Sequence, residues 1–368
     1  MKDSLKSLLE LRENNDESTL EYLAKSSLPL VIYGAGVRAS RLAELLSKNN
    51  IHNYVFAVDR GFEKEGTVFF SEEIDGLYEK YNLLLGHSFL HSLEIPPQFK
   101  HAAKMFSIVG VTRNESISHS FLEEHLALFE ETLSWQQDEL SVKSMLAYLK
   151  GKLTYNGSYL VPYIKAPQYF QQEIFTQRGD IVYVDCGAYT GDTIAKFITF
   201  YPNYNKIIAV EPSPSNLVAL QAYIERERLK NIEIVQKGCA DYSGVVKFVD
   251  DCGNKMGNMI SENGNLTIEV EKMDNFVDKT SPVSLIKMDI EGAELSALKG
   301  ARETILRNEP VLAICAYHKP DDLITIPQYI KSLVPEYRFY FRLHPGALVL
   351  DEAVLYAVTD KHAVKSGE

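Results

Sequence analysis

The segment IVYVDCGAYTGDTIAKF, at residues 181–197, constrains the fold more than any other part of the chain. Its apolar run ends in Asp185 and predicts a buried strand. Gly187 and Gly191 then predict a turn whose backbone can approach a ligand closely, because glycine has no Cβ to collide with it. The helix that follows opens at Asp192. A strand that passes through a glycine turn into a helix is typical of α/β proteins with a largely parallel sheet.

Alternating apolar and amphipathic patterns continue this arrangement as far as residue 358. We predict helices near 191–200, 214–228, 292–307 and 326–333. The predicted strands are Ile181–Asp185, Lys206–Glu211, Ile232–Lys237, Val245–Asp250, Thr267–Glu271, Ser284–Ile290, Val311–Ala316, Tyr337–Phe341 and Ala353–Val358. Helices separate most of the earlier strands, whereas the last two are joined only by a loop. This order predicts a doubly wound sheet that ends in two loop-connected strands.

A smaller α/β pattern precedes this one in the chain. An apolar run at Leu30–Tyr33 leads into a Gly34-Ala35-Gly36 turn, and an amphipathic helix follows. The next strand, Asn53–Val58, ends in Asp59, which completes a β-α-β unit of the nucleotide-binding type. Weaker signals predict two further short strands, Asn82–Leu85 and Lys104–Val109.

The helical patterns between these two α/β regions and before them divide the chain into three parts. Residues 4–25 are expected to form an acidic, leucine-spaced helix that is broken near Asn14-Asn15. Residues 115–150 have helical spacing without proline or glycine, which predicts a connecting helix or a pair of helices, and a Gly-, Pro- and Tyr-rich linker follows. We therefore expect a Rossmann-like domain at residues 1–112, a helical connector and linker at 113–167, and a larger domain at 168–368.

The charge of the chain excludes some classes of partner. Thirty-eight Lys and Arg residues against fifty Asp and Glu residues give a net charge of −12. Because nucleic-acid binding needs a basic surface, we expect no DNA or RNA partner, and an anionic membrane surface is disfavoured for the same reason. The chain has no apolar stretch long enough to span a bilayer, and its first residues lack the apolar core of a secretory signal. The four cysteines show no metal-binding spacing and suggest reduced thiols, so we expect a cytoplasmic protein.

Carboxylates follow each of the first three strands of the larger domain. Asp185 and Asp192 flank the glycine turn, where they would repel a pyrophosphate but suit a ligand with a positive end, such as the amino group and sulfonium of S-adenosylmethionine. Glu211 ends the second strand and is placed to accept both ribose hydroxyls of an adenosine. Asp241, after the third strand, is a candidate acceptor for the adenine amine. If the aspartates do more than cap a helix, the candidate cofactor-binding residues are Asp185, Gly187, Ala188, Gly191, Asp192, Thr193, Glu211, Pro212 and Asp241.

A second group of ionisable residues lies in the segment SLIKMDIEGAELSALKGA. Lys287, Asp289 and Glu291 alternate, so they project to the same side of an extended segment at its carboxyl end. Such clusters shift pKa values for proton transfer, although a salt-bridged helix start that includes Glu294 is the alternative. His318 leaves the next strand at the same edge and is the best candidate general base. The candidate catalytic residues are Asp289, Glu291, His318 and Lys287, of which Lys287 would hold a carboxylate or an acceptor oxygen in place.

We expect no resident metal ion at this site, but one alternative stays open. If Asp289, Glu291 and His318 approach one another, their oxygen ligands and one imidazole would suit magnesium or manganese rather than a structural zinc. Loss of activity on treatment with EDTA would favour that alternative.

The chain resembles the FkbM-type family of S-adenosylmethionine-dependent methyltransferases over about residues 168–358. The most specific part is KMDIEGAELSALKGA, which is close to the family signature Lys-x-Asp-x-Glu-Gly-x-Glu; the segments DCGAYTGDT, VEPSPSN and LAICAYHKPDDL agree in order and spacing. The resemblance implies a class I methyltransferase fold, with a seven-stranded doubly wound sheet and a C-terminal antiparallel hairpin. It also implies S-adenosylmethionine as cofactor and O-methylation of a sugar or secondary-metabolite hydroxyl. Two additional strands between Asp241 and Ser284, joined by MGNMISENG, lie where a substrate loop is expected.

We therefore predict a cytoplasmic methyltransferase that acts on a carbohydrate or other small-molecule hydroxyl, in a context such as polysaccharide biosynthesis. A second hypothesis starts from the N-terminal Gly34-x-Gly36-x-x-Ala39 pattern and Asp59, which fit a nucleotide or sugar nucleotide. That unit would then serve an NAD(P)-dependent oxidoreductase, but the missing third glycine counts against it, and an inert module that packs or forms a homodimer is favoured. A third hypothesis is a binding module that has lost turnover, against which the complete carboxylate set argues.

Overall fold

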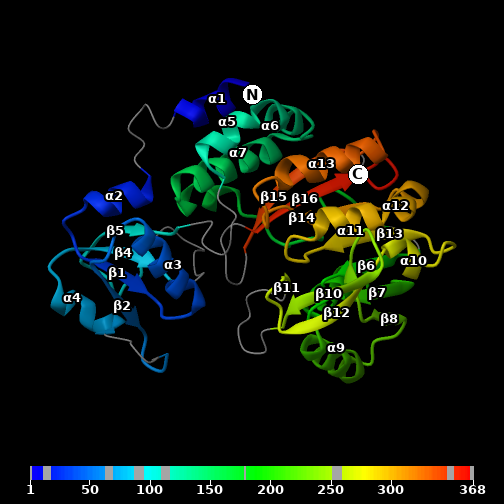
Figure 1. Cartoon of the computed structure of the whole chain (residues 1–368), viewed down its shortest axis with the longest axis horizontal. Coiled ribbons are helices and arrows are strands. Elements are labelled where there is room, and N and C mark those ends of the chain that lie inside the picture. Colours follow the sequence, from blue (N-terminus) through cyan, green and yellow to red (C-terminus); the bar gives the residue numbers. More distant parts are fainter. Residues whose placement is uncertain are drawn as a thin grey trace. The chain divides into compact units, whose positions relative to one another are not determined.

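The computed structural model describes residues 2–10, 18–62, 69–86, 95–108, 117–177, 180–250, 259–345 and 352–364 (Figure 1). The chain forms two compact units. Unit 1 comprises Met1–Ser134, Asp138–Ala166 and Arg342–Ala353, and unit 2 comprises Trp135–Gln137, Pro167–Phe341 and Val354–Glu368. No helix among the described residues is long and apolar enough to cross a membrane.

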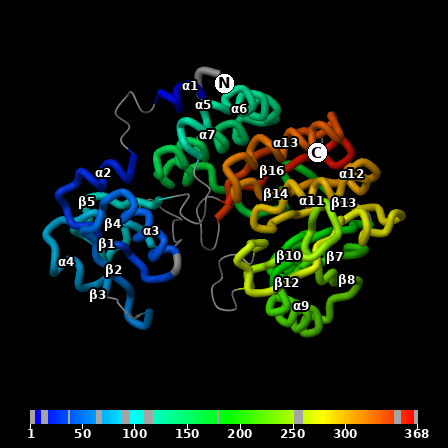
Figure 2. Tube along the Cα trace, in the orientation of Figure 1, coloured from blue at the N-terminus to red at the C-terminus, as the bar shows by residue number. Residues whose placement is uncertain are grey.

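Unit 1 contains a five-stranded sheet in the order β3-β2-β1-β4-β5, and the labels in Figure 2 follow this order. Every pairing in the sheet is parallel. Leu30–Tyr33 (β1) is buried throughout because all four residues are apolar or aromatic. Val37–Lys48 (α3) follows the glycine turn and packs Ala39, Leu42 and Leu46 into the core, as the helical spacing predicts. The other elements of this part are β2 (Tyr54–Val58), β3 (Phe69–Phe70), β4 (Tyr81–Leu85), β5 (Ala102–Phe106), α2 (Thr19–Lys25), η2 (Ser71–Glu73) and α4 (Ile74–Leu77).

The helical part of unit 1 differs from the expected connecting helix or helix pair. Residues 117–154 form three helices, because Ser118 and Asp138 each cap a new helix N-terminus with their side chains. Asp138 also forms a bidentate ion pair with buried Arg342. The Nη2 to Oδ2 distance is 2.6 Å, and the Nη1 to Oδ1 distance is 3.1 Å. The elements are α1 (Lys2–Leu9), α5 (His119–Glu124), α6 (Leu126–Ser134), α7 (Glu139–Thr154), η3 (Gly157–Tyr159) and η4 (Val161–Tyr163). The predicted break near Asn14-Asn15 lies outside the described residues.

Unit 2 is built on a seven-stranded sheet in the order β15-β16-β14-β13-β6-β7-β8. Its central strands pair in parallel, and β16 pairs with β14 in the antiparallel sense. The α/β fold expected from the sequence is confirmed. The strands are β6 (Val182–Cys186), β7 (Lys206–Val210), β8 (Ile232–Val235), β13 (Val283–Met288), β14 (Val311–Cys315), β15 (Arg338–His344) and β16 (Glu352–Val358). The helices between them are α8 (Asp192–Phe200), α9 (Pro214–Glu227), α11 (Glu294–Gly300), α12 (Arg302–Asn308) and α13 (Asp322–Leu333).

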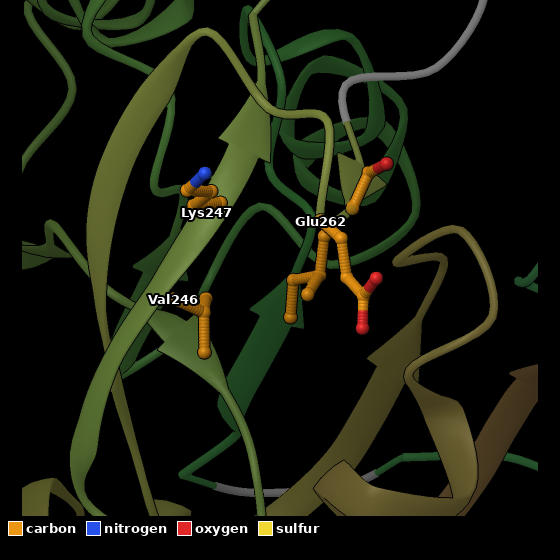
Figure 3. A pocket seen from close by; sticks show the side chains of 5 residues that line it. Val246, Lys247 and Glu262 are labelled. Atoms are coloured by element: carbon orange, nitrogen blue, oxygen red, sulfur yellow. The ribbon is translucent and has the colours of Figure 1, made fainter.

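A small second sheet, in the order β11-β10-β12-β9, lies in the same unit. The two additional strands predicted from the sequence are found as Gly244–Val249 (β10) and Leu266–Glu271 (β12), which pair in the antiparallel sense. The connection between them begins in residues 251–258, which lie outside the described residues. Figure 3 shows a surface pocket formed by β10 and by residues 260–262, which follow in the same chain. It is lined by Val246, Lys247, Ile260, Ser261 and Glu262. The remaining elements are β9 (Gly238–Cys239), β11 (Met259–Ile260) and α10 (Met273–Phe276).

The register of the main sheet positions the residues that matter for function. Asp185 on β6 lies directly beside Lys287 on β13, and Cys186 lies beside Met288. The same β6 residues pair with the end of β7, whose next residue is Glu211. Because these strands are parallel, their carboxyl ends meet at one edge of the sheet, where doubly wound proteins bind ligands.

Candidate active site at the carboxyl ends of the parallel strands

A buried ion pair lies beneath the glycine turn. The Nζ of Lys287 lies 3.0 Å from Oδ1 of Asp185, and both side chains are at most 2% exposed. Lys287 also donates hydrogen bonds to the backbone carbonyls of Cys186 (3.3 Å) and Gly187 (2.8 Å). These bonds fix the backbone of the glycine turn. Of its two predicted roles, holding a carboxylate is the one for which the structure shows a contact.

Burial and this pairing act in opposite directions on Asp185. Burial raises the pKa of its carboxyl to about 6, although the Lys287 ammonium opposes the shift. Burial by itself would lower the pKa of Lys287, but the Asp185 and Asp289 carboxylates raise it above its usual value. The second Asp185 oxygen, Oδ2, has no hydrogen-bond partner among the described residues. Asp185 therefore keeps one unpartnered acceptor under the turn.

The two glycines of the turn are needed by the chain itself. Both have left-handed backbones, with φ of +79° at Gly187 and +91° at Gly191. A Cβ on Gly187 would lie 2.1 Å from the backbone oxygen of Asp289, and one on Gly191 would lie 2.6 Å from the ring of Tyr223. Glycine at these positions thus allows the turn to pack against the end of β13 and against α9. The predicted close approach of a ligand to the turn stays a prediction.

Glu211 joins the two loops that would surround a nucleoside. Its Oε2 accepts the Tyr189 N–H (2.9 Å), and its Oε1 accepts the Ser213 N–H (2.9 Å) and the Asn216 amide (3.2 Å). Burial raises the pKa of the Glu211 carboxyl, against the effect of these donors. A carboxylate has about four acceptor positions, so about one is left for a ligand. Glu211 was expected to bind both ribose hydroxyls. With the three internal donors in place, it has room for about one of them.

The other predicted cofactor residues differ in exposure. Asp192 is exposed in the first turn of α8, whereas Ala188 and Thr193 are buried, and Pro212 is half-buried between Glu211 and α9. The carboxylate of Asp241 is also exposed, but it accepts a hydrogen bond from Ser296 of α11 (2.7 Å). Asp241 follows β9 of the small sheet instead of a strand of the main sheet. Among the described residues, no hydrogen bond or ion pair joins Asp241 to the other predicted cofactor residues.

Asp289 lies just beyond β13 and is held from several sides. The Tyr169 hydroxyl donates to its Oδ2 (2.8 Å), and the Tyr317 hydroxyl lies 3.4 Å from its Oδ1. Burial by itself would raise the pKa of Asp289, but Lys287, His318 and the Tyr169 hydroxyl lower it below its usual value. Its side chain is 27% exposed, so one part of the carboxylate remains open to a ligand.

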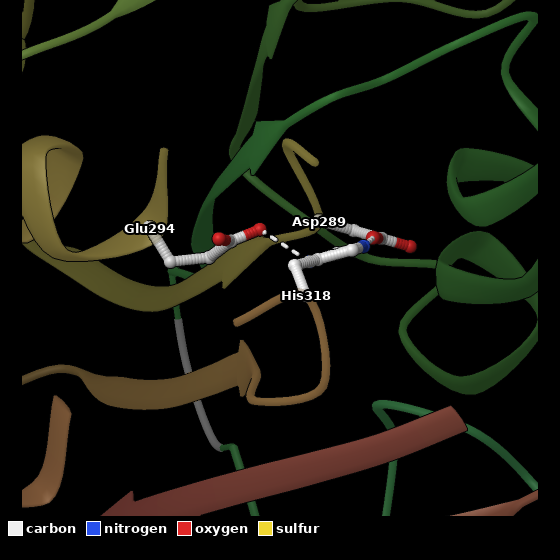
Figure 4. A group of neighbouring side chains, drawn as sticks. All are labelled: Asp289, Glu294 and His318. Atoms are coloured by element: carbon white, nitrogen blue, oxygen red, sulfur yellow. Dashed lines mark ion pairs between the residues drawn. The ribbon is translucent and has the colours of Figure 1, made fainter. Parts of the chain in front are cut away.

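His318 is surrounded by carboxylates, as Figure 4 shows in part. Its Nδ1 lies 3.0 Å from Oε1 of Glu294, and its Nε2 lies 3.3 Å from Oε2 of Glu291 and 3.5 Å from Oδ1 of Asp289. Burial alone would lower the pKa of His318, but Glu294, Glu291 and Asp289 raise it to about 10. At neutral pH the ring is thus an imidazolium, with both nitrogens facing carboxylates. It cannot accept a proton there, so the predicted role of general base does not fit His318.

Glu291 and Glu294 have different positions in this group. Glu291 has a left-handed backbone (φ +59°) and a side chain that is 29% exposed. Glu294 is fully buried, and its Oε1 also accepts the Ile290 N–H (2.9 Å). Glu294 therefore serves the helix start and the histidine, as the salt-bridge alternative predicts, whereas Glu291 reaches the surface beside Asp289.

The same group includes donors that suit a divalent cation. Ligand atoms of Asp289, Glu294 and His318 lie within 4.8 Å of one another. The His318 ring lies between the two carboxylates, with one nitrogen toward each (Figure 4). A metal ion held by these three residues would need the neutral imidazole, whereas the raised pKa of His318 favours the imidazolium. The metal-assisted alternative stays a prediction.

Two residues of the site, Tyr169 and Asp322, are not among those predicted from the sequence. Tyr169 lies directly after the Gly-, Pro- and Tyr-rich linker, as the second residue of the predicted larger domain, and nothing local marks it as a partner of Asp289. Asp322, at the start of α13, is buried and accepts the Lys319 N–H (2.7 Å). Burial and then Glu294 raise the pKa of Asp322 to about 7. The adjacent Asp321-Asp322 pair after a strand could have been noticed as a further carboxylate at this edge.

In unit 1, the proposed ribose residue Asp59 is already bonded within the chain. Its Oδ2 accepts the Tyr33 hydroxyl (2.5 Å), and its Oδ1 accepts the Ser71 hydroxyl. Each carboxylate oxygen thus has an internal donor, which gives no support to a nucleotide site at this strand.

Comparison with known protein families identifies unit 2. Residues 185–342, from the buried Asp185 to Arg342, match the family model described as the methyltransferase FkbM domain. This part of the chain is an FkbM methyltransferase domain. The match includes the glycine turn, Glu211, and the group around His318, whereas Tyr169 lies before it.

The fold of the chain is similar to that of a solved methyltransferase structure. The crystal structure of methyltransferase FkbM from Methylobacillus flagellatus KT is 22% identical, covers 96% of this chain and 98% of its own, and has a TM-score of 0.70. An rRNA methylase from Streptococcus thermophilus (15% identical, 48% of this chain, 85% of its own) and an Aeropyrum pernix fibrillarin with bound S-adenosyl-L-methionine (16%, 50% and 67%) both have TM-scores of 0.32. No curated protein matches the chain.

Proposed function

We propose that the FkbM domain transfers the methyl group of S-adenosylmethionine to a hydroxyl of a carbohydrate or other small molecule. One observation carries the proposal. Two carboxylates, Asp289 and Glu291, are partly exposed at the tip of β13 (27% and 29%), while the cations beside them, Lys287 and His318, are buried. The surface offered to an acceptor is thus rich in carboxylate oxygens, and the buried Lys287 and His318 lower the pKa of Asp289, which keeps that carboxylate ionised.

The neighbouring loops fit the cofactor. Asp185 has an unpartnered buried oxygen, and Glu211 has about one acceptor position left. We assign Glu211 to one ribose hydroxyl, and the turn from Gly187 to Asp192 to the methionine end. When bound, S-adenosylmethionine would supply an electrophilic methyl group on a sulfonium.

Asp289 or Glu291 would take the proton of the acceptor hydroxyl as its oxygen attacks. The bound cofactor would supply the methyl carbon and keep the electron pair of the broken carbon–sulfur bond, leaving as S-adenosylhomocysteine. The site must hold the three atoms in line, which is where a rigid carboxylate contributes most. Lys287 and His318 are positioning residues, since neither has a free acceptor for the proton.

The test combines binding and transfer. Calorimetric titration with S-adenosylhomocysteine measures the cofactor site without needing an acceptor. Transfer of tritium from S-[methyl-³H]adenosylmethionine to methyl glycosides of glucose, mannose and rhamnose measures the reaction. We expect saturable binding, and labelling of at least one glycoside.

Variants separate the two halves of the site. Asp289→Asn or Glu291→Gln should lower kcat by about 10²–10⁴ if that carboxylate is the base, with little change in S-adenosylhomocysteine affinity. Glu303→Gln, an exposed carboxylate on α12 (63%), is the matched control and should change neither. Absence of saturable cofactor binding would refute the proposal. Transfer that stays normal in both site variants would refute the role of the carboxylates.

A further inference from the structure

Tyr169 is an unusual residue for its position. It is buried (3% exposed) and has a left-handed backbone with φ of +68°. This conformation is costly for an aromatic residue, and such residues persist only where their surroundings hold them. Its N–H donates to the hydroxyl of Tyr356 on β16 (2.9 Å), and its ring lies 5.4 Å from the Nζ of Lys287.

The hydroxyl of Tyr169 fixes the orientation of Asp289. It donates to Oδ2 at 2.8 Å, whereas the His318 Nε2 lies on the side of Oδ1 at 3.5 Å. The carboxylate is thus held at both oxygens by groups from different parts of the chain. Rotation of the carboxylate would break the shorter contact, which is the one from Tyr169.

We propose that Tyr169 is a positioning residue for methyl transfer, which acts by holding the Asp289 carboxylate toward the acceptor hydroxyl. The inference rests on the proposed function, because it takes Asp289 as a group that contacts the acceptor. It adds a residue outside the matched FkbM domain, which begins at residue 185. The backbone strain at Tyr169 is then a cost of placing its hydroxyl under Asp289.

The first test measures coupling and needs no acceptor. Unfolding in urea is compared for the wild type, Tyr169→Phe, Asp289→Asn and the double variant. A hydrogen bond to a charged group should appear as a coupling of roughly tenfold to a hundredfold in the unfolding equilibrium constant. Tyr201→Phe is the control, since the buried Tyr201 hydroxyl has no hydrogen-bond partner among the described residues and should show no coupling to Asp289.

The second test measures the reaction with the tritium assay and the methyl glycosides. Tyr169→Phe should lower kcat about 10- to 100-fold, with the KM for S-adenosylmethionine and the affinity for S-adenosylhomocysteine unchanged. In the Asp289→Asn background the same substitution should change kcat less than twofold, because its target is gone. Tyr356→Phe removes the acceptor of the Tyr169 N–H and should give a smaller loss of the same kind.

The outcomes separate this inference from the proposed function. A purely structural role would lower cofactor affinity and kcat together, and would do so equally in both backgrounds; that result overturns the inference. Normal kcat in Tyr169→Phe also overturns it. If the wild type labels none of the glycosides, the proposed function fails. If Tyr169 and Asp289 are then still coupled in unfolding, the pair is structural, and the proposed role of Tyr169 in methyl transfer is overturned as well.

Discussion

His318 should make the folding stability of unit 2 depend on pH in the alkaline range. Its pKa is about 10 in the folded chain and 6.5 in a free histidine. Because the folded value is raised, the stabilisation is fully present below pH 6.5 and is lost as the pH rises toward 10. The substitution that isolates this effect is His318→Gln, which keeps a hydrogen-bonding side chain but has no charge to lose.

The size of the effect follows from the same shift. Each pH unit between the two pKa values changes the unfolding free energy by about 1.4 kcal/mol. Between pH 7.5 and 9.5 the wild type should therefore lose about 2–3 kcal/mol more than His318→Gln. This range starts above the pKa of about 7 of Asp322, whose own titration would otherwise add to the slope.

The assay is urea unfolding followed by circular dichroism at pH 7.5, 8.5 and 9.5. At pH 7.5 the variant should be the less stable protein, because Glu291, Glu294 and Asp289 lose their shared cation. The two stability curves should then converge as the pH rises. Curves that stay parallel within about 0.5 kcal/mol would show that His318 is neutral in the folded chain, and its role as general base would be open again.

Three further predictions concern other contacts of the structure. Glu211→Ala should weaken S-adenosylhomocysteine binding by about 1–3 kcal/mol in calorimetry, with a smaller effect on kcat, because its contacts are alike in ground and transition states; an unchanged affinity would contradict the assignment. Asp138→Ala should lower the unfolding free energy by about 2–4 kcal/mol in urea, since it removes the carboxylate that pairs with buried Arg342 and also the cap of α7, while the Arg342 hydrogen bond to Ser141 remains; a loss below about 1 kcal/mol would mean that water replaces the carboxylate. Gly187→Ala should destabilise more than Gly61→Ala, because both have positive φ but only the first would place a Cβ 2.1 Å from a backbone oxygen; equal losses would show that backbone strain alone decides.

Much of the fold could be read from local patterns. The predicted strands Lys206–Glu211 and Val311–Ala316 differ from the observed β7 and β14 by one residue at the end. The predicted helix at 214–228 is found as Pro214–Glu227. Strand alternation, helical spacing and caps depend on residues that are close in sequence, so a single chain is enough to show them. The very short strands, such as Gly238–Cys239, were missed because they contain too few residues for any pattern.

Apart from Asp241, which follows a strand of the small sheet, the sequence by itself also determined which of the predicted ionisable residues stand at the strand tips, because parallel strands end at the same edge of a sheet. Only the tertiary structure decided what these residues do. Asp185 and Lys287 are 102 positions apart, and only the fold shows that the predicted cofactor residue also forms a buried ion pair with Lys287 beneath the glycine turn. His318 changes from a predicted base to a cation because three carboxylates from the β13–α11 segment converge on it. A pKa depends on burial and on neighbouring charges, and both are set by packing between segments that are distant in the chain.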